Sequence, residues 1–542
     1  MKNRLYVIIL WLASSLLANA ATTYYVATNG VDDAAGGRGL SWDLPYLTIS
    51  NAVKKATTVN DLVLASNGTY LLSDQITVSS QITVQSWNNG AVDPTNTIVN
   101  GNAGTRCFNI NHTGAVVEGF TVYNGNGSGA GGGGVYIKKG TLRNCIVVSN
   151  SAPASDGGGV YFDAYSTGMV DNCLIAYNFA TNGGGIGCYY STAAMLVTNC
   201  VIQNNQATAI VSGTGGGGVS MRYSSGGTLT DSTVSLNSAP FQGGGIWAIV
   251  GGALIIKNCL ISNNFTRVSG NYAGGGGIFF HATAGLVTNC VITSNACNGA
   301  GGGIGVFENG SATIANCRII GNRSTNTATG SHFGGGVDLQ RGTMFNSVIS
   351  DNSALGRGGG IVGAQGAVVR NCLISGNSAS TGGGYDIRYA PGLTLLENCT
   401  IVSNTANSGG GVYFGSDSGI STNFMLNCIV FSNTAGTGPN YWRLVPAEDI
   451  ISASNCCLSP ALSGADINYS SDNITFDPQF VERATGNYRL DRNSPCVNTG
   501  AYRDWMINAV DLDGHRRVDK FSGIVDMGAY EYMPKGAIFF FH

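Results

Sequence analysis

A pattern of apolar and polar positions recurs eleven times between residues 131 and 433. Each copy has a glycine triplet followed by an apolar residue, and then Asn-Cys-x-Ile/Val-x-x-Asn, with Asp231 in place of the Asn once and Ser in place of the Cys twice. Successive copies are 25 to 32 residues apart. Two positions after the cysteine the chain always has Val or Ile, whereas the position between them varies freely, from Arg318 to Leu373. The alternation of a fixed position with a variable one has the two-residue period of a β-strand with one buried face. Each copy therefore predicts short strands joined by turns.

Repetition at this period predicts a solenoid. No apolar run is long enough for the helices of a helical repeat, so we expect an all-β parallel β-helix with about 28 residues per coil. The two Asn residues of each copy then form ladders at the turns, because Asn tolerates the left-handed conformation and its amide can bond the equivalent amide one coil away. The glycine triplets predict bends that need positive φ or an approach too close for a Cβ atom.

The two ends of the chain depart from this repeat. Residues 21–100 predict an N-terminal cap and the first coils, residues 101–435 the repeated coils, and residues 436–542 a C-terminal cap. In the N-terminal cap Thr48 or Ser50 can begin a short helix whose apolar stripe closes the open end of the solenoid. The stripe consists of Ile49, Ala52, Val53 and Ala56.

Residues 1–20 have the composition of an export signal. Lys2 and Arg4 precede the apolar run Leu5–Leu17 and an Ala-Asn-Ala sequence, so we expect cleavage after Ala20. This run is too short to span a membrane as a helix, which disfavours the alternative, a membrane anchor. No later run reaches spanning length. We therefore expect a mature protein outside the cytoplasm with no transmembrane segment.

Composition excludes other classes of protein. Of the 542 residues 81 are glycine, and the eleven triplets account for 33 of them, so the excess is a repeated structural position and does not indicate collagen. Charged residues make up only 11%, but 43% hydrophobic residues rule out disorder. A net charge of -3 without a basic run argues against a nucleic-acid partner.

The cysteines follow the repeat. Nine of the fifteen lie in one ladder between residues 145 and 428, where Ser232 and Ser347 replace two. In an exported chain many cysteines suggest disulfides, but exchange with Ser and an inward position favour small core residues with free thiols. Among the possible disulfides, we favour one that joins Cys496 to either Cys456 or Cys457. Few histidines and no Cys-x-x-Cys argue against zinc, and we expect no metal or other cofactor.

The repeated GGGI or GGGV and the N-x-A step resemble the repeats of chlamydial polymorphic outer-membrane proteins and of bacterial right-handed parallel β-helix proteins. The resemblance covers residues 100–435. It implies right-handed coiling and exposure on the surface or outer membrane of a Gram-negative cell, and it carries over no catalytic residue.

Five C-terminal motifs are similar to the choice-of-anchor Q region of secreted bacterial β-helix proteins. They are Phe476–Phe480, Gly486–Leu490, Ser494–Cys496, Asp511–Gly514 and Asp526–Glu531. The tract Asp511-x-Asp513-Gly514 begins like a calcium loop but lacks the closing Glu, so we interpret it as an Asx turn.

The strand after each glycine triplet carries the candidate chemistry. If its first and third residues face inward, its second and fourth form exposed ladders, and aromatic residues in file could stack on sugar rings. The candidates in the second-position ladder are Tyr136, Tyr161, Trp247, Phe279 and Tyr413. They predict a monomeric structural or adhesive protein that binds a polysaccharide or a cell-surface glycan. A merely solvated face is the competing interpretation.

A polysaccharide lyase or glycoside hydrolase is the alternative function. Asp338 and Asp386 occupy the same ladder two coils apart, roughly 10 Å, which is close to the carboxylate separation of inverting glycosidases. Arg388 lies beside Asp386 in the sequence. The motifs of pectate lyase-like and polygalacturonase-like β-helix enzymes are missing, so we rank catalysis below binding.

Overall fold

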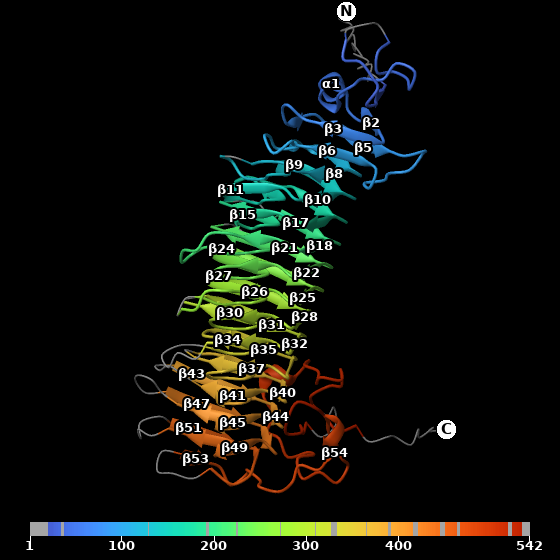
Figure 1. The fold of residues 1–542 in the computed structure, drawn as a ribbon. Coiled ribbons are helices and arrows are strands. Elements are labelled where there is room, and N and C mark those ends of the chain that lie inside the picture. Colours follow the sequence, from blue (N-terminus) through green and yellow to red (C-terminus); the bar gives the residue numbers. More distant parts are fainter. Residues whose placement is uncertain are drawn as a thin grey trace, which may run out of the picture.

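The computed structural model describes residues 20–533 apart from 34–36, 128, 191–194, 224–225, 271–272, 309, 327–332, 365, 388–391, 416–420, 445–449, 463–466 and 519–522. The chain is a parallel β-solenoid whose coils stack along one axis (Figure 1). Three sheets of 27, 15 and 11 strands run along it, and we call them sheets 1, 2 and 3. The predicted export signal lies outside the described residues, apart from Ala20.

A single coil shows how the repeat folds. The strands β12 (Val160–Phe162) and β13 (Met169–Asp171) belong to sheet 1, β14 (Leu174–Ala176) to sheet 2 and β15 (Phe179–Asn182) to sheet 3. Each pairs in parallel with its equivalents in the coils above and below. The predicted all-β parallel solenoid is thereby confirmed. Among the described residues no helix is both long and apolar enough to cross a membrane.

The interior is filled by the fixed positions of the repeat. The Val or Ile two residues after each ladder cysteine, or after the serine that replaces it, is completely buried in all eleven copies, and the ladder cysteines pack beside it. All fifteen cysteines are buried. The backbone N–H of Cys259 donates to Sγ of Cys290 at 3.4 Å, and that of Cys200 donates to Oγ of Ser232 at 3.0 Å. Either side chain accepts this hydrogen bond, which explains why Ser replaces Cys in the ladder.

A buried Asn ladder holds the turn between sheets 2 and 3. The amide of Asn264 donates to the carbonyl of Val234 at 2.9 Å and to Oδ1 of Asn295 at 3.0 Å, and its own Oδ1 accepts the backbone N–H and the amide of Asn237. The Asn before each cysteine forms a second, outer ladder, in which Asn258 has a φ of 55°. In the inner ladder the preceding residue, such as Asn263, takes the positive φ instead.

The glycine triplets meet both predicted requirements. The first glycine takes positive φ in ten of the eleven triplets, as at Gly157 with 71° and Gly243 with 56°, and Gly334 is the exception. At the second glycine the coils are too close for a side chain, because a Cβ atom on Gly158 would lie 2.4 Å from the carbonyl oxygen of Phe179. The excess of glycine is thus a requirement of each bend.

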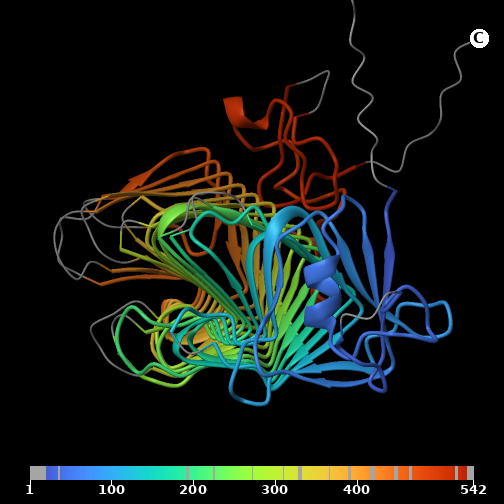
Figure 2. The same ribbon diagram turned by 90° about the horizontal axis from the view of Figure 1, so that it is seen from above.

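The helix α1 (Ile49–Lys55) lies at the N-terminal end of the solenoid (Figures 1 and 2). Its N-cap is Thr48, whose side chain accepts the N–H of Asn51, and its apolar stripe is buried as predicted. The irregular first coils follow. They begin with β1 (Thr23–Val26), β2 (Leu62–Ser66), β3 (Gly68–Leu71), β4 (Ile76–Val78), β5 (Thr83–Trp87) and β7 (Phe108–Glu118).

Residues 476–532, which we call the C-terminal module, fold back alongside the last coils (Figures 1 and 2). Their hairpin pairs β54 (Phe480–Glu482) with β55 (Asn487–Leu490). Tyr488 and Tyr530 pack against Val402 on the outer face of sheet 2. The outer Asn ladder fixes the module as well, because the side chain of Asn427 exchanges hydrogen bonds of 2.8 and 2.7 Å with the backbone of residue 501.

Candidate functional site

The predicted aromatic ladder is not an open surface, which corrects the expectation from the sequence. Trp247 and Phe279 are completely buried and form a small apolar cluster with Phe307, and Tyr413 is buried as well. The triplets cause this burial because their first glycine folds the chain back over the outer face of the strand. A Cβ atom on Gly275, for example, would lie 2.5 Å from the Cβ of Phe279. The second-position residues therefore line a concave corner.

The candidate catalytic residues are not presented to a substrate. Asp338 and Asp386 are completely buried and lie two coils apart in register, with Val362 between them. Burial raises the pKa of Asp338 well above its ordinary value. The carboxylate of Asp386 accepts a 2.6 Å hydrogen bond from the hydroxyl of Thr381. Arg388 lies outside the described residues.

A pocket of about 290 Å³ opens on the concave corner near the start of the repeat. It exists because Gly187 takes the ladder position between Tyr161 and Ser220. A Cβ atom on Gly187 would lie 2.9 Å from that of Asp156, so the missing side chain makes room for this carboxylate. We call this site the tyrosine pocket. It is lined by Ala154, Ser155, Asp156, Tyr161, Thr181, Asn182, Tyr189, Thr214 and Arg222.

An ion pair between the half-buried Arg222 and the buried Asp156 fixes the polar side of the tyrosine pocket. Nε and Nη2 of Arg222 lie 3.0 and 2.9 Å from Oδ2 of Asp156, and the amide of Asn182 donates to Oδ1 at 2.9 Å. Burial raises the pKa of Asp156, and the positive charge of Arg222 opposes that shift. Because partners hold these groups in place, they meet a ligand without losing further side-chain freedom.

Tyrosine rings form the other side of the pocket. The ring of Tyr161 lies 5.5 Å from that of Tyr136 in the neighbouring coil, and the guanidinium of Arg222 stacks on Tyr189 at 4.5 Å. Burial raises the pKa of Tyr161, so its hydroxyl stays protonated at neutral pH. Of the five aromatic candidates from the sequence, Tyr161 lines this pocket and Tyr136 contacts the ring of Tyr161.

Two exposed tyrosines extend the aromatic surface beyond the pocket. Tyr190 follows β16 (Ile186–Tyr189) and Tyr223 follows β20 (Val219–Arg222), one coil further on. Their rings stack at 5.1 Å, and both contact Tyr189. They are 52% and 41% exposed, unlike the buried ladder aromatics. The repeat pattern did not single them out, although a tyrosine follows the same strand in two successive copies. Exposed rings beside fixed hydrogen-bonding groups suit a ligand with apolar faces and polar edges.

A larger cavity of about 790 Å³ lies between α1 and the first coils, but its polar groups serve the cap. The Asp32 carboxylate accepts the backbone N–H groups of Leu47 and Thr48 at 2.9 and 3.1 Å. The lining includes Tyr70, which is buried and donates to the carbonyl of Ser66. This cavity has no exposed aromatic ring among its described residues.

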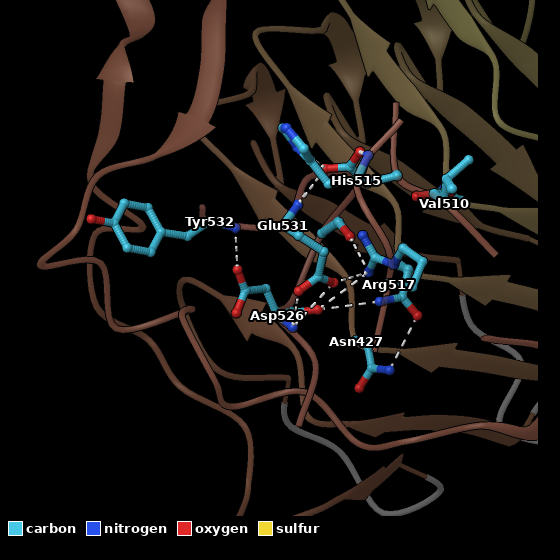
Figure 3. Close-up of polar contacts among 12 residues, drawn as sticks. Asn427, Val510, His515, Arg517, Asp526, Glu531 and Tyr532 are labelled. Atoms are coloured by element: carbon cyan, nitrogen blue, oxygen red, sulfur yellow. Dashed lines mark hydrogen bonds and ion pairs between the residues drawn. The ribbon is translucent and has the colours of Figure 1, made fainter. Parts of the chain in front are cut away.

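The C-terminal module contains a buried polar cluster (Figure 3). Arg517 is completely buried, and its Nη2 lies 2.9 Å from the carbonyl oxygen of Gly528 and 3.3 Å from Oε1 of Glu531. The carboxylate of Glu531 accepts a hydrogen bond from the backbone N–H of Asp526. The carboxylate of Asp526 in turn accepts hydrogen bonds from the backbone N–H groups of residues 498 and 532. The cluster joins segments of the module to one another. Its backbone also bonds the solenoid, because the carbonyl of Asp526 accepts from the amide of Asn398 and the N–H of Ala529 donates to the hydroxyl of Thr400.

The Asp511 carboxylate organises the adjoining turn. Its Oδ1 accepts the backbone N–H groups of Asp513 and His515 at 2.9 and 2.7 Å, and its Oδ2 accepts that of Glu531 at 2.8 Å. Asp513 pairs with Arg489. Side-chain ligand atoms of Asp511, Asp513 and His515 lie within 4.8 Å of one another. The acidic oxygens are nevertheless engaged by backbone donors and an arginine, which is the predicted Asx turn.

The Glu531 carboxyl predicts a pH dependence of the module. Burial raises its pKa from 4.5 to about 8, against the opposing charge of Arg517. A carboxyl with a raised pKa in the folded state stabilises that state fully below its unfolded pKa, and the contribution is lost as the pH rises through the folded value. We expect the melting temperature of the module to fall between about pH 5 and about pH 8. Glu531→Gln should flatten this slope, and an unchanged slope in the variant would contradict the assignment.

A family-model match over part of the chain supports the fold. The family model described as the right handed beta helix region matches residues 210–339 and 276–443. No curated protein matches the chain. Among solved structures, pectate lyase Pel9A is 13% identical with a TM-score of 0.31, covering 95% of this chain and 98% of its own. A rhamnogalacturonan lyase is 12% identical with a TM-score of 0.22, covering 93% and 97%. Likenesses this distant carry no information on activity.

Strand order and register define the chain as a parallel β-solenoid, and the match to the family model over residues 210–443 supports a β-helix repeat protein. Within that class the chain is distinguished by its repeated Asn-Cys step and by a C-terminal module that docks on the side of the solenoid.

Proposed function

We propose that this chain is a secreted or cell-surface β-helix protein that binds a polysaccharide in the tyrosine pocket. The observation that carries the proposal is the fixed Arg222–Asp156 pair beside the exposed, stacked rings of Tyr190 and Tyr223. A sugar ring offers apolar C–H faces to aromatic rings and hydroxyl groups to planar polar side chains. Because Arg222 and Asp156 neutralise each other, the pair favours an uncharged sugar.

The proposed location outside the cytoplasm is supported by the N-terminal sequence. Lys2, Arg4 and the apolar run that follows have the order of an export signal. The resemblance of the repeats to outer-membrane proteins favours the surface of a Gram-negative cell. A glycan ligand fits such a location, since polysaccharides are abundant there.

The direct test is to remove the exposed rings. We expect Tyr190→Ala with Tyr223→Ala to weaken binding of an oligosaccharide selected on a glycan array by at least about tenfold, or about 1.4 kcal/mol. Isothermal titration calorimetry measures the change. Tyr177→Ala is the matched control, because Tyr177 is 60% exposed but follows a strand of sheet 2. It should leave the affinity unchanged.

Two outcomes would overturn this assignment. Equal affinity in the wild type and the double variant would place the ligand elsewhere. Release of new reducing ends or unsaturated uronates, abolished by Asp338→Asn or Asp386→Asn, would establish a hydrolase or lyase in place of a binding protein.

A further inference from the structure

Two cysteines lie at the contact between the last coil and the C-terminal module. Cys457 lies in β52 (Cys457–Leu458), in register with Ile429, an outward-facing residue of sheet 2. Cys496 lies in the C-terminal module, within the turn Ser494–Cys496. Both are completely buried, and they belong to the same apolar cluster between the module and the last coil.

The two thiols face each other across this interface. The thiol of Cys457 lies within hydrogen-bonding reach of the thiol of Cys496 and 3.2 Å from the carbonyl oxygen of Phe476. The backbone around Cys496 is held on both sides, because its N–H donates to Oγ of Ser494 and its carbonyl accepts the N–H of Met527. The contact is therefore built into the docked module.

The ladder cysteines have a different environment. Their thiols donate to the carbonyl two residues earlier, as Cys290 does to Thr288 at 3.2 Å, and their sulfurs accept a backbone N–H from the neighbouring coil. Those sulfurs already serve the coil-to-coil hydrogen bonding of the solenoid. Cys457 and Cys496 instead come from segments on opposite sides of an interface, the arrangement that a cross-link requires.

We propose that Cys457 and Cys496 are the site of a disulfide that fastens the C-terminal module to the last coil. The inference rests on the proposed export, which brings the chain into an oxidising compartment. The thiolate of one cysteine attacks the disulfide of an external oxidant to form a mixed disulfide. The thiolate of the other cysteine then attacks this mixed disulfide and releases the oxidant. The two cysteines lose two protons and two electrons, and the disulfide of the oxidant is reduced to two thiols. The cross-link closes a loop and so destabilises the undocked state.

Peptide mapping of the full chain tests the proposal. Protein recovered from the export compartment, or refolded with oxidised glutathione, is denatured, alkylated and digested. We expect one linked peptide pair containing Cys457 and Cys496, the loss of the mass of two hydrogens, and alkylation of every other cysteine. Fifteen alkylated cysteines, or a link between other cysteines, would overturn the proposal. Mapping of the wild type decides the question even where a variant fails to fold.

Thermal unfolding supplies the second measurement. The melting temperature of the wild type should fall by several degrees when the protein is reduced. Cys496→Ser should have this lower melting temperature both with and without reductant. Cys188→Ser, in the solenoid core, should still melt at a lower temperature with reductant than without it. A wild type that melts alike in both conditions would contradict the cross-link. Glycan binding is measured separately in the tyrosine pocket, so failure of one proposal is distinguishable from failure of the other.

Discussion

Replacement of Asn264 by alanine is expected to lower the free energy of unfolding by about 3–5 kcal/mol. The Asn264 side chain bonds the carbonyl of Val234 and the side chain of Asn295, and it accepts two hydrogen bonds from Asn237. These groups are buried, and each one left without a partner costs about 1–3 kcal/mol. A shift of the denaturant midpoint measures the loss, and hydrogen exchange shows whether it begins in the adjoining coils.

The matched control for this prediction is Asn258→Gly in the outer ladder. Asn258 has a φ of 55°, which glycine adopts without strain, and its amide bonds Asp231 at the exposed edge of the turn. We expect a loss below about 1 kcal/mol. If the Asn264 variant were as stable as this control, the inner ladder would not be what holds the coils together.

Arg517→Met is expected to cost about 3–5 kcal/mol and to release the C-terminal module from the solenoid. Arg517 is completely buried beside Glu531, so removal of its charge leaves a buried carboxyl group and the carbonyl of Gly528 without their partner. Limited proteolysis should cut the variant within residues 476–532 while the solenoid stays intact, because the coils have their own core.

The control for the module is Arg489→Met. Arg489 pairs with Asp513, but its side chain is 48% exposed, so the expected loss is below about 1 kcal/mol. Equal resistance of the Arg517 variant and the wild type to proteolysis would show that the buried cluster does not hold the module.

Much of the fold could be predicted from the sequence because each coil repeats the same local constraints. The Val or Ile two residues after each ladder cysteine predicted the inward face of sheet 2, and the apolar stripe with Ile49 and Val53 predicted the helix α1. Both depend on residues close in sequence. The second-position ladder was interpreted wrongly because alternation reveals which residues point outward but not what covers them. At Trp247 and Phe279 the cover is the backbone of the preceding triplet.

The tyrosine pocket shows the same limit. Arg222 and Asp156 meet across 66 residues of sequence, and the pocket exists only because Gly187 interrupts the ladder between them. No pattern of residues close in sequence predicts the contact between Arg222 and Asp156. Tyr161 was found from its position in the repeat, whereas Tyr190 and Tyr223 lie just outside the strand that the pattern defines.

A crystal structure of the protein grown with the oligosaccharide that binds best on a glycan array tests the central claim most directly. We predict a sugar ring against Tyr190 and Tyr223, with hydroxyl groups within hydrogen-bonding distance of Arg222, Asp156 or Asn182. An oligosaccharide bound at another surface, with the tyrosine pocket empty at saturating ligand, would contradict the account.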